Sequence, residues 1–124
     1  MRQDGPIEKL VGSLEAEVVR AVWAADGGVA VRDVLERLNR GLKEPLAYTT
    51  VMTVMARLAE KDILRRRREG RGYVYEAVAH DAAGIAVHNL IRDFGDAALA
   101  HFVDEARSDP KVLKRLERLL REET

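Results

Sequence analysis

The segment over residues 48–75 constrains the fold more than any other part of the chain. A helix-like stretch over residues 48–62 runs directly into two strand-like segments over residues 64–75, joined by a turn between Gly70 and Gly72. The chain carries no other hairpin signal, and its remaining apolar residues recur at the 3.6-residue period of a helix. We therefore expect a mostly α-helical protein with one small β-hairpin.

This hairpin is strongly basic, although the chain as a whole has no net charge. One carboxylate and five arginines give it a local charge of +4, and residues 1–80 carry the positive balance while residues 81–124 carry the negative one. The guanidinium group is well shaped to hold phosphate oxygens, so the pattern indicates nucleic-acid binding. The alternative is a solvated strand face without function. The arginines are Arg65, Arg66, Arg67, Arg68 and Arg71.

Residues that would carry other chemistry are missing or scattered. The 124-residue chain has no cysteine, which excludes disulfides and thiolate metal sites, and His80, His88 and His101 are too far apart in sequence to suggest a shared metal. No serine–histidine pair or phosphate-binding glycine loop is evident, so we expect no enzyme, no metal and no cofactor. There is no signal segment and no run of roughly 18 apolar residues, which predicts a cytoplasmic protein without a membrane partner. Nucleic-acid binding would make it nucleoid-associated.

Three helices are expected before the hairpin. The first begins with Ser13 as N-cap and ends at residues 26–28, the second spans about residues 31–40, and the third is the stretch over residues 48–62. Three helices followed by a hairpin is the order of a winged helix-turn-helix, in which the third helix enters the major groove and the hairpin flanks it as a wing. Residues 1–80 would form this DNA-binding domain.

The third helix has two distinct faces. One is a stripe of core residues, and the other begins with threonines, whose short side chains suit close approach to the major groove. Local capping by the threonines is the simpler alternative. The core stripe consists of Val51, Val54, Met55 and Leu58, and the outer face includes Thr49, Thr53, Arg57 and Glu60.

Residues 46–61, together with the basic hairpin and Tyr73-Val74-Tyr75, resemble the penicillinase-repressor family, the BlaI/MecI/CopY group. Leu14-Glu15 and Val22-Trp23 fit the same family, and the resemblance covers essentially the whole chain. It implies a bacterial transcriptional repressor, a homodimer that binds double-stranded operator DNA with TACA and TGTA elements in an inverted repeat. It also implies control of β-lactam resistance or related genes, an antibiotic response.

The resemblance implies which residues contact DNA. Met52 takes a position that is often polar in relatives, which leaves the base preference open. The hairpin arginines, Arg65 to Arg68 and Arg71, would contact phosphates or the minor groove, and alternation along a strand predicts that about half of them face DNA. The recognition-helix contacts would be Thr49, Thr50, Met52, Thr53 and Arg57.

Residues 81–124 are expected to form a helical dimerisation region. Apolar residues lie at helical spacing over residues 87–103, and Asp109-Pro110 begins another helix as N-cap and first helical residue. Two such helices cannot bury their apolar stripes alone and must pack on the winged helix or on a second copy of the chain. Because the basic domain already has its own core, a second copy is the expected partner. The interface residues would be Leu90, Ile91, Phe94, Leu99, Phe102, Val103, Leu113, Leu116 and Leu120.

Two routes of regulation and one alternative function remain open. In β-lactam-responsive relatives a protease linked to a sensor cleaves an Asn-Phe bond in the dimerisation helices. Residues 98–103 resemble the cleaved segment, with His101 in place of the asparagine and Phe102 as the phenylalanine. Copper-responsive relatives use paired cysteines, which this chain lacks. Alternatively, a small aromatic ligand releases the DNA, which an apolar pocket near Trp23 or Phe94 would favour, or the winged helix binds an acidic protein instead of DNA.

Overall fold

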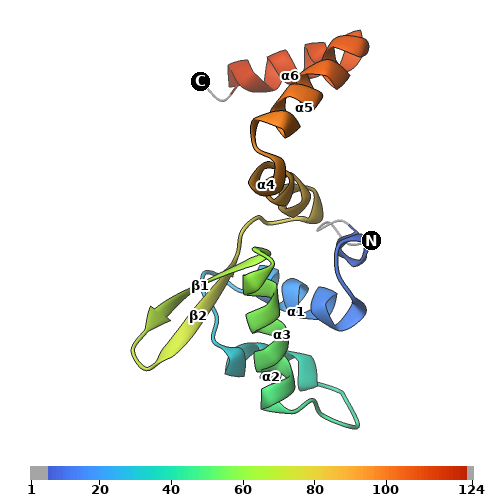
Figure 1. Cartoon of the computed structure of the whole chain (residues 1–124). Helices are drawn as coiled ribbons and strands as arrows, with labels where there is room; N and C mark the ends of the chain where they lie inside the picture. The colour runs from blue at the N-terminus through green and yellow to red at the C-terminus, as the bar shows by residue number, and fades with distance from the viewer. Residues whose placement is uncertain (1–5, 123–124) are drawn as a thin grey trace. The chain divides into compact units, whose positions relative to one another are not determined.

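The computed structural model describes residues 6–122, which form helices and a single two-stranded antiparallel sheet (Figure 1). The expected mostly α-helical fold with one hairpin is confirmed. The chain divides into two compact units, Met1–Asn89 and Leu90–Thr124, and the boundary falls inside helix α4. The elements in chain order are η1 (Ile7–Lys9), α1 (Ser13–Ala24), α2 (Val31–Asn39), α3 (Tyr48–Glu60), β1 (Leu64–Glu69), β2 (Gly72–Ala77), α4 (Ala82–Phe94), α5 (Asp96–Ser108) and α6 (Pro110–Glu122).

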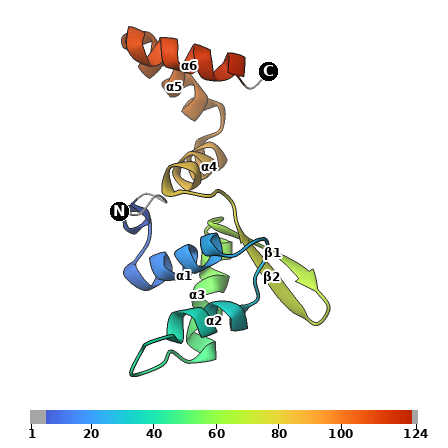
Figure 2. The same ribbon diagram turned by 180° about the vertical axis from the view of Figure 1, so that it is seen from behind.

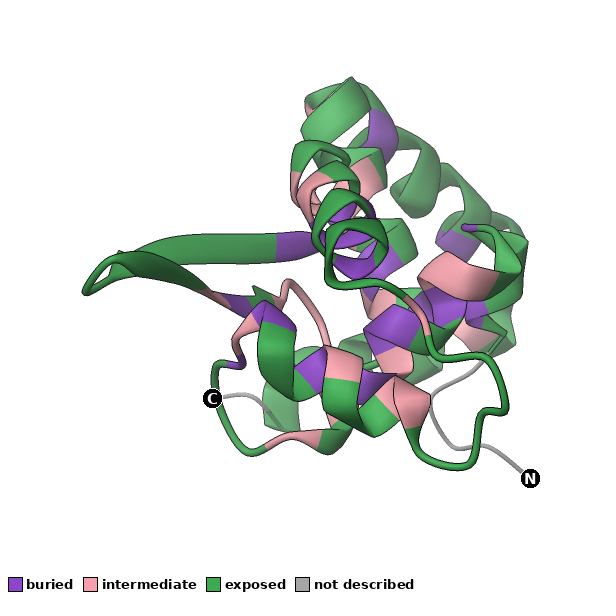
Figure 3. Cartoon of the chain, turned by 90° about the horizontal axis from the view of Figure 1, so that it is seen from below, coloured by how far each residue is buried: buried purple, intermediate pink, exposed green. Residues whose placement is uncertain are grey.

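The first unit has its core between α1, α2 and α3, which pack against one another (Figure 2). The predicted stripe of α3 is confirmed, because Val51, Met55 and Leu58 are fully buried and Val54 is nearly so. Figure 3 shows the buried residues gathered where the helices face one another, while the outer part of the hairpin is exposed. The core therefore holds α3 by one face and leaves its other face open.

The start of α1 differs from the prediction, because Ser13 is the first helical residue and Gly12 is the N-cap. The Glu15 carboxylate accepts a hydrogen bond from the Gly12 N–H at 3.1 Å and also binds the Lys61 ammonium at 3.1 Å. Partial burial tends to raise the pKa of Glu15, but the Gly12 hydrogen bond and Lys61 outweigh it and lower the pKa. A carboxylate in the first turn thus takes the capping role expected of the serine.

The hairpin, residues 64–77, is called the wing below. Its register pairs Arg66 with Tyr75 and Arg68 with Tyr73. Val29, in the segment between α1 and α2, extends the sheet by one bridge: its N–H donates to the Tyr75 carbonyl at 2.9 Å, and its carbonyl accepts from the Tyr75 N–H at 2.8 Å. This bridge attaches the base of the wing to the helical core.

Gly28, in the segment between α1 and α2, lies directly against Val74 of the wing. A Cβ atom added there would come within 2.0 Å of Cγ1 of Val74, a separation that forces atoms to move. We expect Gly28→Ala to destabilise the protein by about 1–3 kcal/mol, as overpacking does, and to lower its melting temperature by several degrees. The matched control is Gly72→Ala, since nothing lies within 4 Å of that position. Equal melting temperatures for the two variants would contradict the prediction.

The second unit contains α5 and α6, which pack against each other, and the end of α4. The sequence suggested one apolar stripe over residues 87–103, but the structure breaks it at Gly95, whose φ of 57° is the left-handed conformation that glycine adopts easily. The predicted cap of α6 is present, because Asp109 Oδ1 accepts from the Lys111 N–H at 3.0 Å. Over residues 6–122, no helix has both the length and the apolar character needed to cross a membrane.

Candidate nucleic-acid interface

The outer face of α3 presents the predicted recognition residues to solvent. Thr49, Thr50, Thr53 and Arg57 are exposed, and Met52 is 41% exposed. The N-cap of α3 is Ala47, without a side-chain hydrogen bond, and no threonine hydroxyl in this helix is hydrogen-bonded within the described part of the chain. Capping therefore does not account for the threonines.

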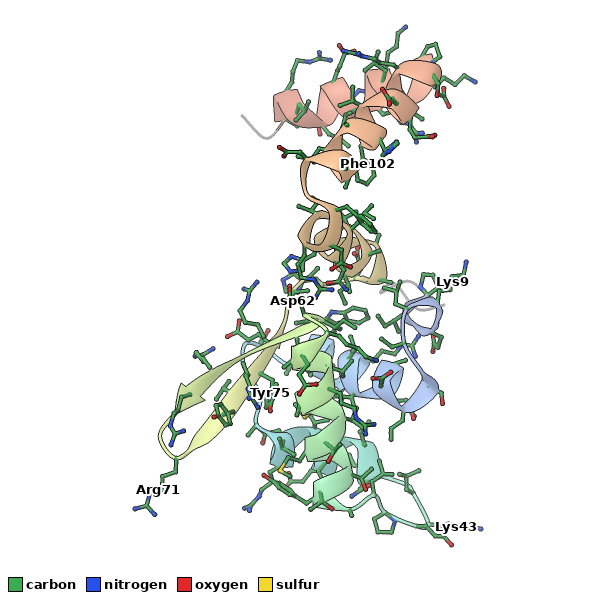
Figure 4. The ribbon with its side chains drawn as sticks, in the orientation of Figure 1. Lys9, Lys43, Asp62, Arg71, Tyr75 and Phe102 are labelled. Carbon is green, nitrogen blue, oxygen red and sulfur yellow. The ribbon has the colours of Figure 1, made fainter. Side chains whose placement is uncertain are left out.

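A groove of about 890 Å³ runs between α3, the start of α2 and the wing. It brings together part of the predicted set, namely Met52, Thr53 and Arg57 from α3 and Arg66 and Arg71 from the wing. Thr49 and Thr50 lie outside it, as do Arg65, Arg67 and Arg68. In Figure 4 the labelled Arg71 lies at the far end of the wing and Tyr75 near its base.

Three groove residues were not among the predicted DNA contacts. Arg32 comes from α2, Tyr48 from the start of α3, and Tyr73 from β2. Tyr48 directly precedes the threonines and is 47% exposed. A bulky aromatic residue next to the recognition positions could therefore have been predicted from the sequence to lie at the DNA-binding surface. Arg32 had no such signal, because its place in the groove depends on how α2 packs.

The wing separates its arginines into two faces. Residues directly opposite each other in an antiparallel pair share a face, so Arg66 and Arg68 lie with Tyr73 and Tyr75 on what we call the groove face. Arg65 and Arg67 lie on the other side, the back face, with Glu76. All four arginines are exposed.

Arg66 is held by two tyrosines on the groove face. Its guanidinium carbon lies 4.4 Å from the centre of the Tyr73 ring, and Arg68 is 5.9 Å from the same ring, both within range of a cation–π interaction. A hydrogen bond with the Tyr75 side chain raises the pKa of Arg66, and the nearby Glu60 carboxylate acts in the same direction. Tyr75 is only 2% exposed, so the exposed Arg66 lies beside a buried ring as well as the exposed ring of Tyr73.

Arg67 on the back face is neutralised within the wing itself. It forms ion pairs with Glu76 and, at 3.3 Å, with Glu69. Arg65 lies beside Glu76 at a hollow of about 290 Å³ that Trp23 and His80 also line. The two faces thus carry the same number of strand arginines, but their surroundings differ in charge.

The second unit leaves most of its apolar side chains exposed. Among its described residues only Ala98 and Ala106 are buried, while Phe94 and Leu120 are each 63% exposed. A hollow of about 410 Å³, which we call the Phe94 hollow, is lined mainly by Leu90, Phe94, Ala98 and Phe102. Of the predicted interface residues, Leu90, Ile91, Phe94, Leu99, Phe102, Val103, Leu116 and Leu120 are exposed and Leu113 is partly buried.

The three histidines lie on separate elements. His80 precedes α4, His88 is within α4, and His101 is in the middle of α5 next to Phe102. Within residues 6–122 the structure contains no group of three or more histidine, aspartate or glutamate side chains arranged to hold a metal ion.

Comparison with known proteins agrees with this geometry. Residues 11–122 match the family described as Penicillinase repressor. The chain is 39% identical over 106 residues to the transcriptional regulator BlaI of two Mycobacterium tuberculosis strains, CDC 1551 and H37Rv, an alignment that covers 80% of this chain and 75% of each relative. The resemblance found in the sequence is confirmed: the chain belongs to the penicillinase repressor family of transcriptional repressors, which are not enzymes.

Proposed function

We propose that the chain represses transcription by binding an inverted-repeat operator as a homodimer, with α3 in the major groove of each half-site. The observation that carries this proposal is the groove, which combines Met52, Thr53 and Arg57 of α3 with Arg66 and Arg71 of the wing on one surface. The exposed face of α3 supplies hydroxyl, apolar and guanidinium groups, which are the groups that contact base edges and thymine methyls.

The roles divide between the helix and the wing. Thr53 and Arg57 contact bases, Met52 touches a thymine methyl, and Thr49 and Thr50 bind phosphate at the start of α3, where backbone N–H groups favour anions. Arg66, Arg68 and Arg71 bind phosphates or enter the minor groove and position the helix without determining sequence. Arg65 and Arg67 contribute little, because the back face carries Glu76.

A second copy of the chain covers the second unit in this proposal. Two buried alanines do not form a core, so the exposed apolar residues of α4, α5 and α6 need a partner surface. A twofold dimer supplies the same surface twice and places two recognition helices on one inverted repeat. Residues 1–80 then bind the operator, and residues 81–124 supply the dimer contacts.

Selection of bound duplexes from a random pool tests this function. The wild-type chain should enrich an inverted repeat, and Thr53→Ala or Arg57→Ala should change the preferred half-site, since a lost base contact costs about 1–3 kcal/mol. The control is Arg37→Ala, an exposed arginine of α2 outside the groove, which should keep the wild-type preference. Equal weakening on every duplex would assign α3 a role in phosphate binding alone, and failure to enrich any sequence would favour binding to an acidic protein.

Two inducing mechanisms fit specific observations. We propose cleavage between His101 and Phe102 by a sensor-linked protease; because this bond lies inside α5, cleavage requires that the helix open locally. The second candidate is release by a small apolar ligand, which the Phe94 hollow favours. Mass spectrometry of the protein from cells exposed to a β-lactam separates them, since a fragment ending at His101 indicates cleavage and an intact chain that has left the DNA indicates a ligand.

A further inference from the structure

The loop that follows the recognition helix contains an unusual backbone conformation. Asp62, two residues after the end of α3, has a φ of 58°, and it is the sole non-glycine residue with positive φ in the described part of the chain. This conformation is disfavoured for residues with a Cβ atom and persists where surrounding contacts hold it. The contacts of Asp62 include one with a residue of α4.

Asp62 Oδ2 lies 2.5 Å from Nε2 of His88 in α4, and the two side chains are each 35% exposed. The pair is thus partly shielded from water, where a hydrogen bond between a ring nitrogen and a carboxylate is stronger than at a fully exposed site. A hydrogen bond of this kind restrains direction as well as distance. It joins the end of the recognition helix to a helix that begins more than 20 residues later.

The first half of α4 belongs to the core of the first unit. Ile85 is fully buried and Ala82 is 4% exposed, and both lie in the same apolar cluster as Val51 and Leu58 of α3. Asp81 caps the helix, because its Oδ1 accepts a hydrogen bond from the Gly84 N–H at 2.7 Å. His88 follows Ile85 by about one helical turn. The hydrogen bond of His88 to Asp62 therefore adds a directional contact to the apolar packing of Ile85.

The second half of α4 carries the first residues of the proposed dimer interface, Leu90, Ile91 and Phe94. A helix of 13 residues is about 20 Å long, so a tilt of about 10° at one end moves the other end by about 3.5 Å. That displacement is close to the rise of one base pair, about 3.4 Å. A contact that fixes the direction of α4 on the winged helix therefore acts on the distance between two operator half-sites.

We propose that Asp62 and His88 are positioning residues that set the direction of α4 relative to α3, and thereby the half-site spacing that the homodimer accepts. Neither residue touches DNA in this scheme. The inference rests on the proposed function, since it needs a dimer on an inverted repeat. It adds a determinant of spacing that lies outside both the recognition helix and the dimer interface.

The test uses the full chain and four duplexes: the selected inverted repeat, the same repeat with one or two base pairs inserted between its half-sites, and a single half-site. Wild-type protein should prefer the uninserted repeat. His88→Ala and Asp62→Gly should each reduce the ratio of affinities between the uninserted and the two-base-pair repeat by about tenfold, since a loosened dimer tolerates the wrong span. Asp62→Gly suits the positive φ, so its backbone stays unstrained.

Two matched variants complete the design. His88→Gln keeps a side-chain N–H for Asp62 and should restore the ratio to within about twofold of wild type, because the hydrogen bond is retained. His80→Ala removes an exposed histidine for which the described residues show no hydrogen bond, and it should leave the ratio unchanged. Affinity for the single half-site and the dimer mass from light scattering should be the same for all five proteins.

Two results would overturn the inference. One is an unchanged spacing ratio in both His88→Ala and Asp62→Gly, and the other is an equal loss on all duplexes, the single half-site included, which would show that the pair only stabilises the fold. Failure of the proposed function looks different, because wild-type protein itself would then bind the selected repeat and random duplex equally.

Discussion

Cutting the chain after Asn89 is expected to leave a monomer that binds the operator at least about 10²-fold more weakly than the full chain, because a monomer loses the linked second half-site. The cut is placed there because Ala82 and Ile85 belong to the core of the first unit. A chain ending at residue 80 would lose both and would report on unfolding as well as on dimerisation. Light scattering and binding isotherms on operator duplex measure the two effects.

A point variant tests the same interface in the full chain. Phe94 is 63% exposed, so Phe94→Glu should keep the fold, oppose dimerisation by burying a charge, and weaken operator binding in parallel. Leu10→Glu is the matched control, since Leu10 is 41% exposed, belongs to the first unit and is not one of the proposed interface residues. A dimeric truncated chain would refute the placing of the interface in residues 90–124, and a full chain that is monomeric without any substitution would refute the dimer itself.

Replacing Arg66 and Arg68 with alanine is expected to make the salt dependence of DNA binding clearly shallower. Each lost phosphate contact removes about 0.9 from the slope of log affinity against log salt, and a dimer loses every contact twice. Operator and random duplex should weaken by similar factors, because phosphate contacts carry no sequence information. The measurement is a set of isotherms on both duplexes between about 50 and 200 mM salt.

The wing supplies a control with the same change in charge. Arg65→Ala with Arg67→Ala removes two arginines from the same strand, but from the back face, where Arg67 is paired with Glu76 and Glu69. The slope should change much less in this variant than in the groove-face variant. If both double variants change the slope equally, the arginines of the two faces contribute equally to phosphate binding, and the division of the wing into two faces does not matter for DNA binding.

The sequence predicted the elements that depend on local periodicity. The stripe of Val51, Met55 and Leu58 identifies the inner face of α3 because burial on a helix follows the 3.6-residue period. The hairpin was predictable because its turn contains Gly70, and glycine easily adopts the positive φ that this turn requires. The end of one helix and the start of the next were harder to predict. The apolar pattern continues across Gly95, and only the backbone conformation of this residue shows that α4 ends and α5 begins there.

The site could be predicted only in part, for a physical reason. Alternation along β1 divides the arginines into two sets, but the sequence does not say which set faces α3. That choice depends on the bridge between Val29 and Tyr75, a contact between residues 46 positions apart that fixes how the wing is attached. The place of Arg32 in the groove depends likewise on how α2 packs, and the burial of Ile85 depends on the core cluster that it shares with residues distant in sequence.

The position of β1 at the margin of the sheet has a consequence for solubility. Within residues 6–122, β1 pairs with β2 on one side, so its other side presents unpaired backbone groups that could join a strand from another molecule. Four consecutive arginines along that strand make two such edges repel each other. The same residues that would attract a polyanion therefore also keep hairpins of separate molecules from stacking into aggregates, and variants with several of them removed should be handled at low concentration.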